Sequence, residues 1–257
     1  MKLPKELLDQ IFIKLDFNII VGLGKDFDFI AHKKYSGKKY SETGYSEKNF
    51  WDWAARNGHL DVVQWLHINR KEGYTIYTMS CAARNGHLDV VQWLHLNIKQ
   101  DYTTWVMDVA AFCGHLHVVK WLHLNSEATC TKWAMDFAAQ NGHLHVIEWL
   151  HLNRKEGCTQ SAMDRAARNG HLAIVEWLHR NRKEGCTKNA MDFAAMNGHL
   201  DVVEWLHRNR TEGCTKNAMD FAAMNGHLHV VEWLRLNRNE VHFEEINSQC
   251  NITITWV

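Results

Sequence analysis

The sequence predicts an all-α fold, a solenoid of seven short helix–turn–helix repeats, and three observations support this. The dipeptide Gly-His recurs every 28 residues from Gly58 to Gly226. Each copy continues with Leu, a β-branched pair and Trp-Leu. The 257 residues include a single proline, Pro4, which suits a chain composed mostly of helices. A lone helical hairpin cannot bury its apolar face, whereas stacked neighbours can, and this stacking produces a solenoid.

The copy that starts at Cys214 illustrates the first helix of each unit. Thr215 is the expected N-cap, because a threonine hydroxyl can accept a hydrogen bond from a free backbone N–H. Gly226 is expected to end the helix, because glycine tolerates the left-handed conformation of a C-cap. Helical spacing places four apolar residues on one face: Ala218, Met219, Ala222 and Ala223. The paired alanines of each copy should let neighbouring helices approach closely.

The second helix of each unit follows the Gly-His dipeptide. In the preceding copy we expect it over about residues 199–209. Its predicted buried face consists of Leu200, Val202, Val203 and Leu206, with Trp205 alongside. Full burial of the tryptophan would contribute about 4–6 kcal/mol per repeat as an upper bound.

Composition and charge exclude several classes of protein. Lys and Arg together number 29, as do Asp and Glu, so the net charge is zero and the basic footprint of a nucleic-acid-binding protein is missing. No apolar run has the length of a membrane span. The apolar N-terminus carries Glu6, Asp9 and Lys14, unlike a signal peptide. We therefore expect a monomeric intracellular protein, in the cytoplasm or a host's cytoplasm, with reduced thiols and with neither nucleic acid nor membrane as partner.

Residue types that bind metals recur with the same period. Equivalent atoms in stacked repeats should lie about 10 Å apart, one helix diameter, which is too far for a disulfide between neighbours or for one shared zinc ion. We therefore interpret the cysteine column as packing: Cys130, Cys158, Cys186 and Cys214. The histidine of each Gly-His is expected to bond backbone at the inter-helix turn. The histidine after each Trp-Leu is expected to favour the carboxyl end of its own helix.

Histidine pairs and a column of aspartates are the remaining candidates for chemistry. The pairs are His115 and His117, His143 and His145, and His227 and His229. Residues two apart on a helix do not face each other, which argues against zinc binding. The aspartates recur in five successive repeats, whereas a catalytic group is needed once. We interpret them as helix-stabilising groups: Asp108, Asp136, Asp164, Asp192 and Asp220. We predict no enzymatic activity, metal or cofactor.

The repeated pattern "AAxNGHLxVVxWLH" resembles the ankyrin repeat, whose first helix ends in paired alanines and whose second opens with Gly-His-Leu. The resemblance covers about residues 46–240 in seven copies. The period is 28 residues instead of about 33, and "AMD" replaces the usual "TPLH". The missing residues fall where ankyrin repeats place a β-hairpin finger, so we expect a shortened finger or none. The resemblance implies that a protein target binds the concave face.

Positions that vary between copies are the candidates for target binding. The residue after the alanine pair varies between copies, and it supplies the first candidates: Arg56, Arg84, Phe112, Gln140, Arg168, Met196 and Met224. By the resemblance these lie at the end of the first helix on the concave side, and Arg, Phe and Met are favoured at interfaces. Trp105 and Trp133 belong to another variable position. Either they form an exposed aromatic pair or they pack under the loops.

The N-terminal segment, residues 1–36, lies outside the repeats. Its stretch "LPKELLDQIFIKLDF" resembles the start of an F-box. This resemblance implies contact with a Skp-family adaptor and hence with a cullin-based ubiquitin ligase. The contacting residues would be Leu3, Pro4, Leu8, Ile11 and Leu15. The alternative is that the segment only caps the solenoid, which needs a polar end for solubility.

The predicted organisation continues with a linker over residues 37–45, seven repeats over 46–241, and a degenerate capping half-repeat or tail over 242–257. An F-box segment followed by ankyrin-like repeats resembles proteins of giant DNA viruses and some protists. The predicted function is a protein–protein interaction module that recruits substrates to a cullin-type ubiquitin ligase. The alternative is an ankyrin-like binding scaffold with no link to ubiquitin.

Overall fold

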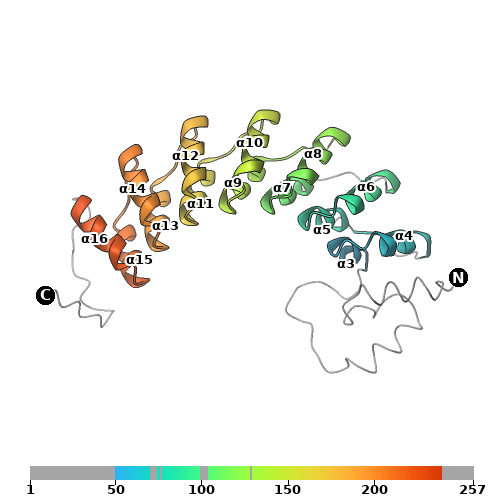
Figure 1. Cartoon of the computed structure of the whole chain (residues 1–257), viewed down its shortest axis with the longest axis horizontal. Coiled ribbons are helices and arrows are strands. Elements are labelled where there is room, and N and C mark those ends of the chain that lie inside the picture. Colours follow the sequence, from blue (N-terminus) through green and yellow to red (C-terminus); the bar gives the residue numbers. More distant parts are fainter. Residues whose placement is uncertain (1–49, 70–73, 76, 99–103, 128, 239–257) are drawn as a thin grey trace, which may run out of the picture. The chain divides into compact units, whose positions relative to one another are not determined.

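The computed structural model describes residues 50–69, 74–75, 77–98, 104–127 and 129–238 (Figure 1). These residues form fourteen α-helices and no strand. The chain divides into two compact units, residues 1–101 and 102–257. The predicted F-box-like segment, the linker and the C-terminal tail lie outside the described residues.

The helices come in pairs that follow the 28-residue period. Within the first unit the pairs are α3 (Phe50–Arg56) with α4 (Leu60–Asn69), and α5 (Thr78–Arg84) with α6 (Leu88–Asn97). The second unit contains α7 (Trp105–Phe112), α8 (Leu116–Asn125), α9 (Lys132–Gln140), α10 (Leu144–Asn153), α11 (Gln160–Arg168), α12 (Leu172–Asn181), α13 (Lys188–Met196), α14 (Leu200–Asn209), α15 (Asn217–Met224) and α16 (Leu228–Asn237). We call the odd-numbered helices first helices and the even-numbered ones second helices.

The two kinds of helix form separate rows in the second unit (Figure 1). First helices of successive repeats pack closely against one another, whereas second helices contact their neighbours much less. The connector from α10 to α11, residues 154–159, contains no strand. The expectation of a shortened finger or none is therefore confirmed for this connector.

Threonine caps begin three of the first helices, α9, α11 and α13. The hydroxyls of Thr131, Thr159 and Thr187 accept hydrogen bonds from the backbone N–H two residues later, at 3.1 Å. The predicted cap, Thr215, accepts the same 3.1 Å bond from the N–H of Asn217, but it lies one residue before Lys216, the N-cap of α15. Each cap satisfies a backbone donor that would otherwise lack a partner at the start of the helix.

Glycine ends the first helices, also as predicted. Gly226 has a φ of +76°. Its N–H bonds the carbonyl of Ala223 at 3.0 Å, and the N–H of His227 bonds that of Ala222 at 2.9 Å. These two bonds form a Schellman motif, which requires the left-handed conformation that glycine adopts without strain.

The second helices bury a narrower face than the pattern predicts. In α14, Val202, Val203 and Leu206 are buried as expected, but Leu200 and Trp205 are half-exposed. The Trp205 ring meets the His179 ring of the preceding repeat edge-on, with centroids 5.2 Å apart. The prediction that Leu200 is buried is therefore wrong. Because the tryptophan keeps part of its surface in water, it contributes less than full burial would.

Alanine pairs allow the close packing of the first helices. Ala166 and Ala167 have no exposed surface, and their helix α11 packs against both α9 and α13. We expect Ala166→Leu to lower the free energy of unfolding by about 2 kcal/mol, because a well-packed interior does not accommodate three extra carbons. Urea denaturation followed by circular dichroism measures the change.

The control for this prediction is Ala173→Leu, the same substitution at an exposed position of α12. It should change the stability by less than about 0.5 kcal/mol. Equal losses in the two variants would contradict close packing at Ala166.

Candidate protein-binding surface

A stripe of variable side chains runs across the first helices of the second unit. On α9 it comprises Trp133, Phe137 and Gln140, which share a face because they are four and three residues apart. We call this stripe the variable face and define it by these residues: Trp105, Phe112, Trp133, Phe137, Gln140, Ser161, Arg165, Arg168, Asn189, Phe193, Met196, Asn217, Phe221 and Met224. All fourteen side chains are exposed or half-exposed.

The predicted target-binding residues occupy two positions in these helices. Those after the alanine pair are the last residues of their helices, with Arg84, Arg168 and Met224 exposed and the other four half-exposed: Arg56, Phe112, Gln140 and Met196. Arg56 and Arg84 belong to the first unit. Trp105 is 41% exposed and Trp133 is 55% exposed. This exposure favours the surface alternative for both tryptophans over packing under the loops.

The backbone at the variable position is held by constant residues of the next repeat. Asn169 and His171 both bond the carbonyl of Gln140, at 2.6 and 3.1 Å. The corresponding asparagines bond Phe112, Arg168 and Met196 at 2.7, 2.6 and 2.9 Å. The fold therefore uses the backbone of this position, and its side chain can change without loss of these bonds.

The Gly-His histidines bond backbone as predicted, but they reach the preceding repeat. His87 bonds the carbonyl of Arg56 at 2.9 Å. The same rings lie against glycine, since a Cβ built on Gly114 would stand 2.6 Å from Nδ1 of His143. Burial lowers the pKa of His143, and the nearby His145 lowers it further, against the raising effect of a bond to the Phe112 backbone.

The paired histidines lie closer together than helical spacing predicts. The ring centroids of His115 and His117 are 5.8 Å apart, and those of the other two pairs are 6.1 and 6.2 Å apart. The assumption that the rings do not approach is wrong, because the first histidine precedes the helix and has a φ of −83° and a ψ of 69°. Among the described residues no group of three or more His, Cys, Asp or Glu is placed to hold a metal ion.

The aspartate column, which the sequence predicts to stabilise helices, bonds the threonine at the start of the next first helix and so joins neighbouring repeats. Asp164 is buried and accepts bonds from the backbone N–H and the hydroxyl of Thr187, at 2.8 and 2.7 Å. Three other aspartates bond the next threonine in the same way, at 2.6–2.8 Å: Asp108, Asp136 and Asp192. Burial raises the pKa of Asp164 above its ordinary value, although the Thr187 bonds offset part of the effect.

The second histidine column lies in the last turn of its own helix, as expected, and it also joins neighbouring repeats. Nη1 of Arg154 donates to Nδ1 of His123 at 3.2 Å, so the ring must accept at this nitrogen. The His123 ring meets Trp149 edge-on at 5.2 Å. Arg182 and Arg210 make the equivalent bonds to His151 and His179, each at 3.3 Å.

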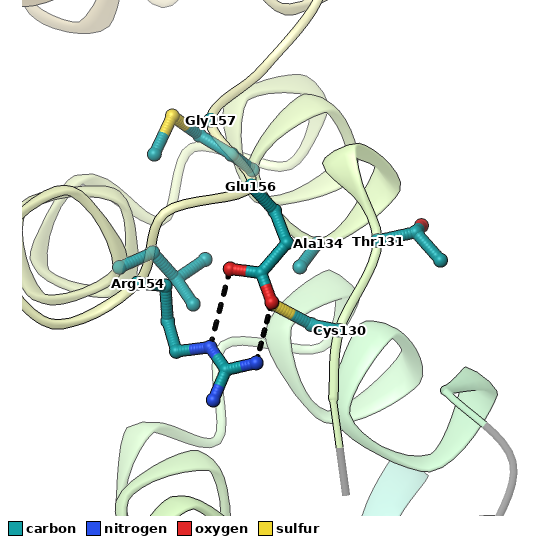
Figure 2. Close-up of a pocket in the computed structure, with 8 residues that line it drawn as sticks. Cys130, Thr131, Ala134, Arg154, Glu156 and Gly157 are labelled. Carbon is teal, nitrogen blue, oxygen red and sulfur yellow. Dashed lines mark hydrogen bonds and ion pairs between the residues drawn. The ribbon is translucent and has the colours of Figure 1, made fainter.

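Cysteine lies beside an ion pair in a small pocket between repeats (Figure 2). Arg154 donates to both carboxylate oxygens of Glu156, at 3.3 and 2.5 Å. Cys130 lines the same pocket and is 5% exposed. Burial raises the pKa of Cys130 to about 11 and that of Cys158 to about 12, so these thiols stay protonated at neutral pH. The packing interpretation of this column agrees with this burial.

An aromatic and arginine cluster occupies the variable face around α9. Phe137 meets Phe112 edge-on at 5.6 Å and lies 5.7 Å from Trp133. The Arg165 guanidinium lies 4.9 Å from the Phe137 ring centroid, and its Nη1 donates to the side chain of Gln140 at 2.8 Å. Arg168 lies 5.3 Å from the Phe193 ring centroid.

One column of this surface was not among the residues predicted from the sequence: Phe137, Arg165, Phe193 and Phe221. Its signal was available, because Phe137 stands four residues after Trp133 and three before Gln140. At that spacing three residues share one side of a helix.

A family model for ankyrin repeats in three copies matches the chain in overlapping windows, residues 51–136, 79–164, 106–192, 135–220 and 163–248. The chain therefore belongs to the ankyrin-repeat family. Proteins of this family bind protein partners, which makes this chain a protein–protein interaction module. Comparison with curated proteins gives no match. None of the helices in the described ranges is long and apolar enough to cross a membrane.

Proposed function

We propose that this protein is an adaptor that holds a target on the variable face and delivers it to a cullin-type ubiquitin ligase. One observation carries the target-binding half of the proposal. In the last four repeats an asparagine bonds the backbone at the variable position of the preceding repeat, while the side chain there stays exposed or half-exposed. Such a surface can change its specificity without changing the fold.

The delivery half of the proposal is supported by the N-terminal sequence. The stretch from Leu3 to Leu15 resembles the start of an F-box. In that reading Leu3, Pro4, Leu8, Ile11 and Leu15 contact a Skp-family adaptor. The absence of any predicted catalytic residue fits a recruiting role, because the ligase supplies the chemistry. We expect this protein itself, as distinct from the Skp-family adaptor, to act as a monomer inside the cell.

A pull-down with a purified Skp-family adaptor tests delivery. Wild type should capture the adaptor, and Leu3→Asp should abolish capture, because a charged side chain replaces an apolar contact. Pro4→Ala should weaken capture. Circular dichroism should show unchanged helix content, since neither residue belongs to the repeats. Failure of wild type to capture the adaptor would refute delivery.

The second candidate function is a binding scaffold with no link to ubiquitin. It is favoured by the need of every solenoid for a capped end, which residues 1–36 would supply. Wild type would then capture no Skp-family adaptor, and removal of these residues would lower the stability of the repeats. Target binding is tested separately by affinity capture with wild type and with a variant altered at Arg84, Phe112 and Gln140, which should lose the captured partner.

A further inference from the structure

We infer that the segment bound by the variable face is an acidic stretch of protein that carries a bulky apolar side chain. This inference rests on the proposed target-binding function and specifies the chemistry of the partner. Its carboxylates would contact Arg165 and Arg168, and its apolar side chain would lie on Trp133 and Phe137.

The exposed charges of the first helices in the second unit are almost all positive. Their exposed or half-exposed basic side chains in the second unit are Lys132, Arg165, Arg168, Lys188 and Lys216, the last of which immediately precedes α15. The aspartates of α7, α9, α11 and α13 are buried and bonded to threonine. The half-buried Asp220 is the remaining acid on these helices.

The second helices of the same unit carry both signs. Arg180 pairs with Glu176 and Arg208 pairs with Glu204, each at 2.9 Å. The whole chain has a net charge of zero. A positive row on a neutral protein attracts an acidic partner to this face, and it opposes binding of a basic one.

The two arginines are held in place for binding. The Arg165 guanidinium lies over Phe137, and its bond to Gln140 uses one of five N–H donors. Arg168 lies over Phe193 one repeat further along. A guanidinium fork matches a carboxylate in two parallel hydrogen bonds, and a fork already oriented loses less entropy on binding.

The aromatic side chains provide the apolar half of the site. Trp133 is 55% exposed, and its ring lies 5.7 Å from the ring of Phe137, which also contacts Arg165 and Phe112. Met196 and Met224 extend this apolar surface along the later repeats. Aromatic and arginine side chains together are the composition of strong protein-binding sites. Methionine is flexible and polarizable, so these two side chains can adapt to an apolar side chain of the partner.

The experiment selects 12-residue peptides from a random displayed library on the full-length protein and measures the enriched peptides by fluorescence anisotropy. We expect enriched peptides to be acidic and to contain Leu, Phe or Trp. Relative to wild type, the affinity for these peptides should fall about tenfold or more in the double variant Arg165→Gln, Arg168→Gln. The separate variant Trp133→Ala should show a loss of similar size. Replacing the acidic residues of the peptide by Gln and Asn should have a similar effect, and added salt should weaken binding.

The matched control is the double variant Arg180→Gln, Arg208→Gln, which removes the same charge from the second helices. It should leave the affinity unchanged. Arg165→Lys, Arg168→Lys keeps the charge but loses the fork, so it should bind with intermediate affinity. Thermal melts of all variants exclude unfolding as the cause.

Three outcomes would overturn the inference. The first is enrichment of neutral or basic peptides. The second is an affinity that stays unchanged when Arg165 and Arg168 are replaced. The third is a twelve-nucleotide oligo(dT) that binds more tightly than any peptide. Neutral peptides that lose affinity when the variable face is altered would leave target binding intact and refute only the acidic chemistry. A selection that enriches no peptide would refute both. Failure of adaptor capture refutes delivery alone.

Discussion

Gly114→Ala is expected to lower the free energy of unfolding by about 3 kcal/mol. About 1 kcal/mol comes from the left-handed backbone, because Gly114 has a φ of +78° and an alanine Cβ is strained there. The rest comes from His143, whose Nδ1 would stand 2.6 Å from the new Cβ. The ring also bonds the Phe112 backbone, so moving it away costs about 1 kcal/mol for that bond and more for lost packing.

Gly226→Ala separates the two contributions. Gly226 has nearly the same φ, +76°, but no described atom lies within 4 Å of a Cβ at this position. The variant should lose only about 1 kcal/mol. The double variant Gly114→Ala, His143→Ala should be less destabilised than the sum of its single variants, because the clash is gone. Urea denaturation measures the free energy of unfolding of the double variant and of the single variants Gly114→Ala, His143→Ala and Gly226→Ala. Equal losses for Gly114→Ala and Gly226→Ala would disprove the role of the histidine contact.

Asp164→Ala is expected to lower the free energy of unfolding by about 2–3 kcal/mol, because the N–H and hydroxyl of Thr187 both lose their acceptor. Asp164→Asn should cost less than about 1 kcal/mol, since an amide oxygen can still accept from the N–H and the amide carries no charge to bury. The control is Asp201→Ala on the exposed side of α14, with a change of less than about 0.5 kcal/mol. A larger loss in Asp164→Asn than in Asp164→Ala would contradict the proposed bonding.

The same aspartate gives a pH dependence with a defined sign. The pKa of Asp164 is raised in the folded protein, so the folded carboxyl binds a proton more tightly than the unfolded one. Its contribution to stability is complete below the ordinary aspartate pKa of about 4 and is lost as the pH rises through the raised pKa. Wild type should therefore lose stability relative to Asp164→Asn between pH 4 and 7, and urea titrations at both pH values measure the difference. A relative gain by wild type would show that the pKa is lowered instead.

The repeat pattern predicted most of the local structure. The positions of Thr215 and Gly226 identified the ends of a first helix, because capping depends on residues adjacent in sequence. The second helix was expected over about residues 199–209 and spans Leu200–Asn209. Burial was predicted less well, because Leu200 and Trp205 have apolar side chains but lie at the edge of the interface between repeats.

The partners of the polar columns were not predicted, although the Gly-His histidines were expected to bond backbone. Asp164, His123 and Arg154 each bind a residue of another repeat, 23 or 31 positions away. A regular period predicts that such residues recur, but it does not predict which residue of a neighbouring repeat each one binds. The aspartates were therefore predicted only as helix-stabilising groups without a partner, and the histidine pairs were judged by helical spacing although His115 precedes its helix.

The sequence by itself determined the number of repeats, the two helices in each and the class of protein, because caps, turns and apolar periodicity act over a few residues. Only the tertiary structure decided what the constant polar residues do and which variable side chains gather into one surface. Phe137, Gln140 and Arg165 come from two repeats, and their contacts depend on how closely α9 and α11 pack. That distance is set by the buried alanines, whose effect on neighbouring helices requires both helices to be in place.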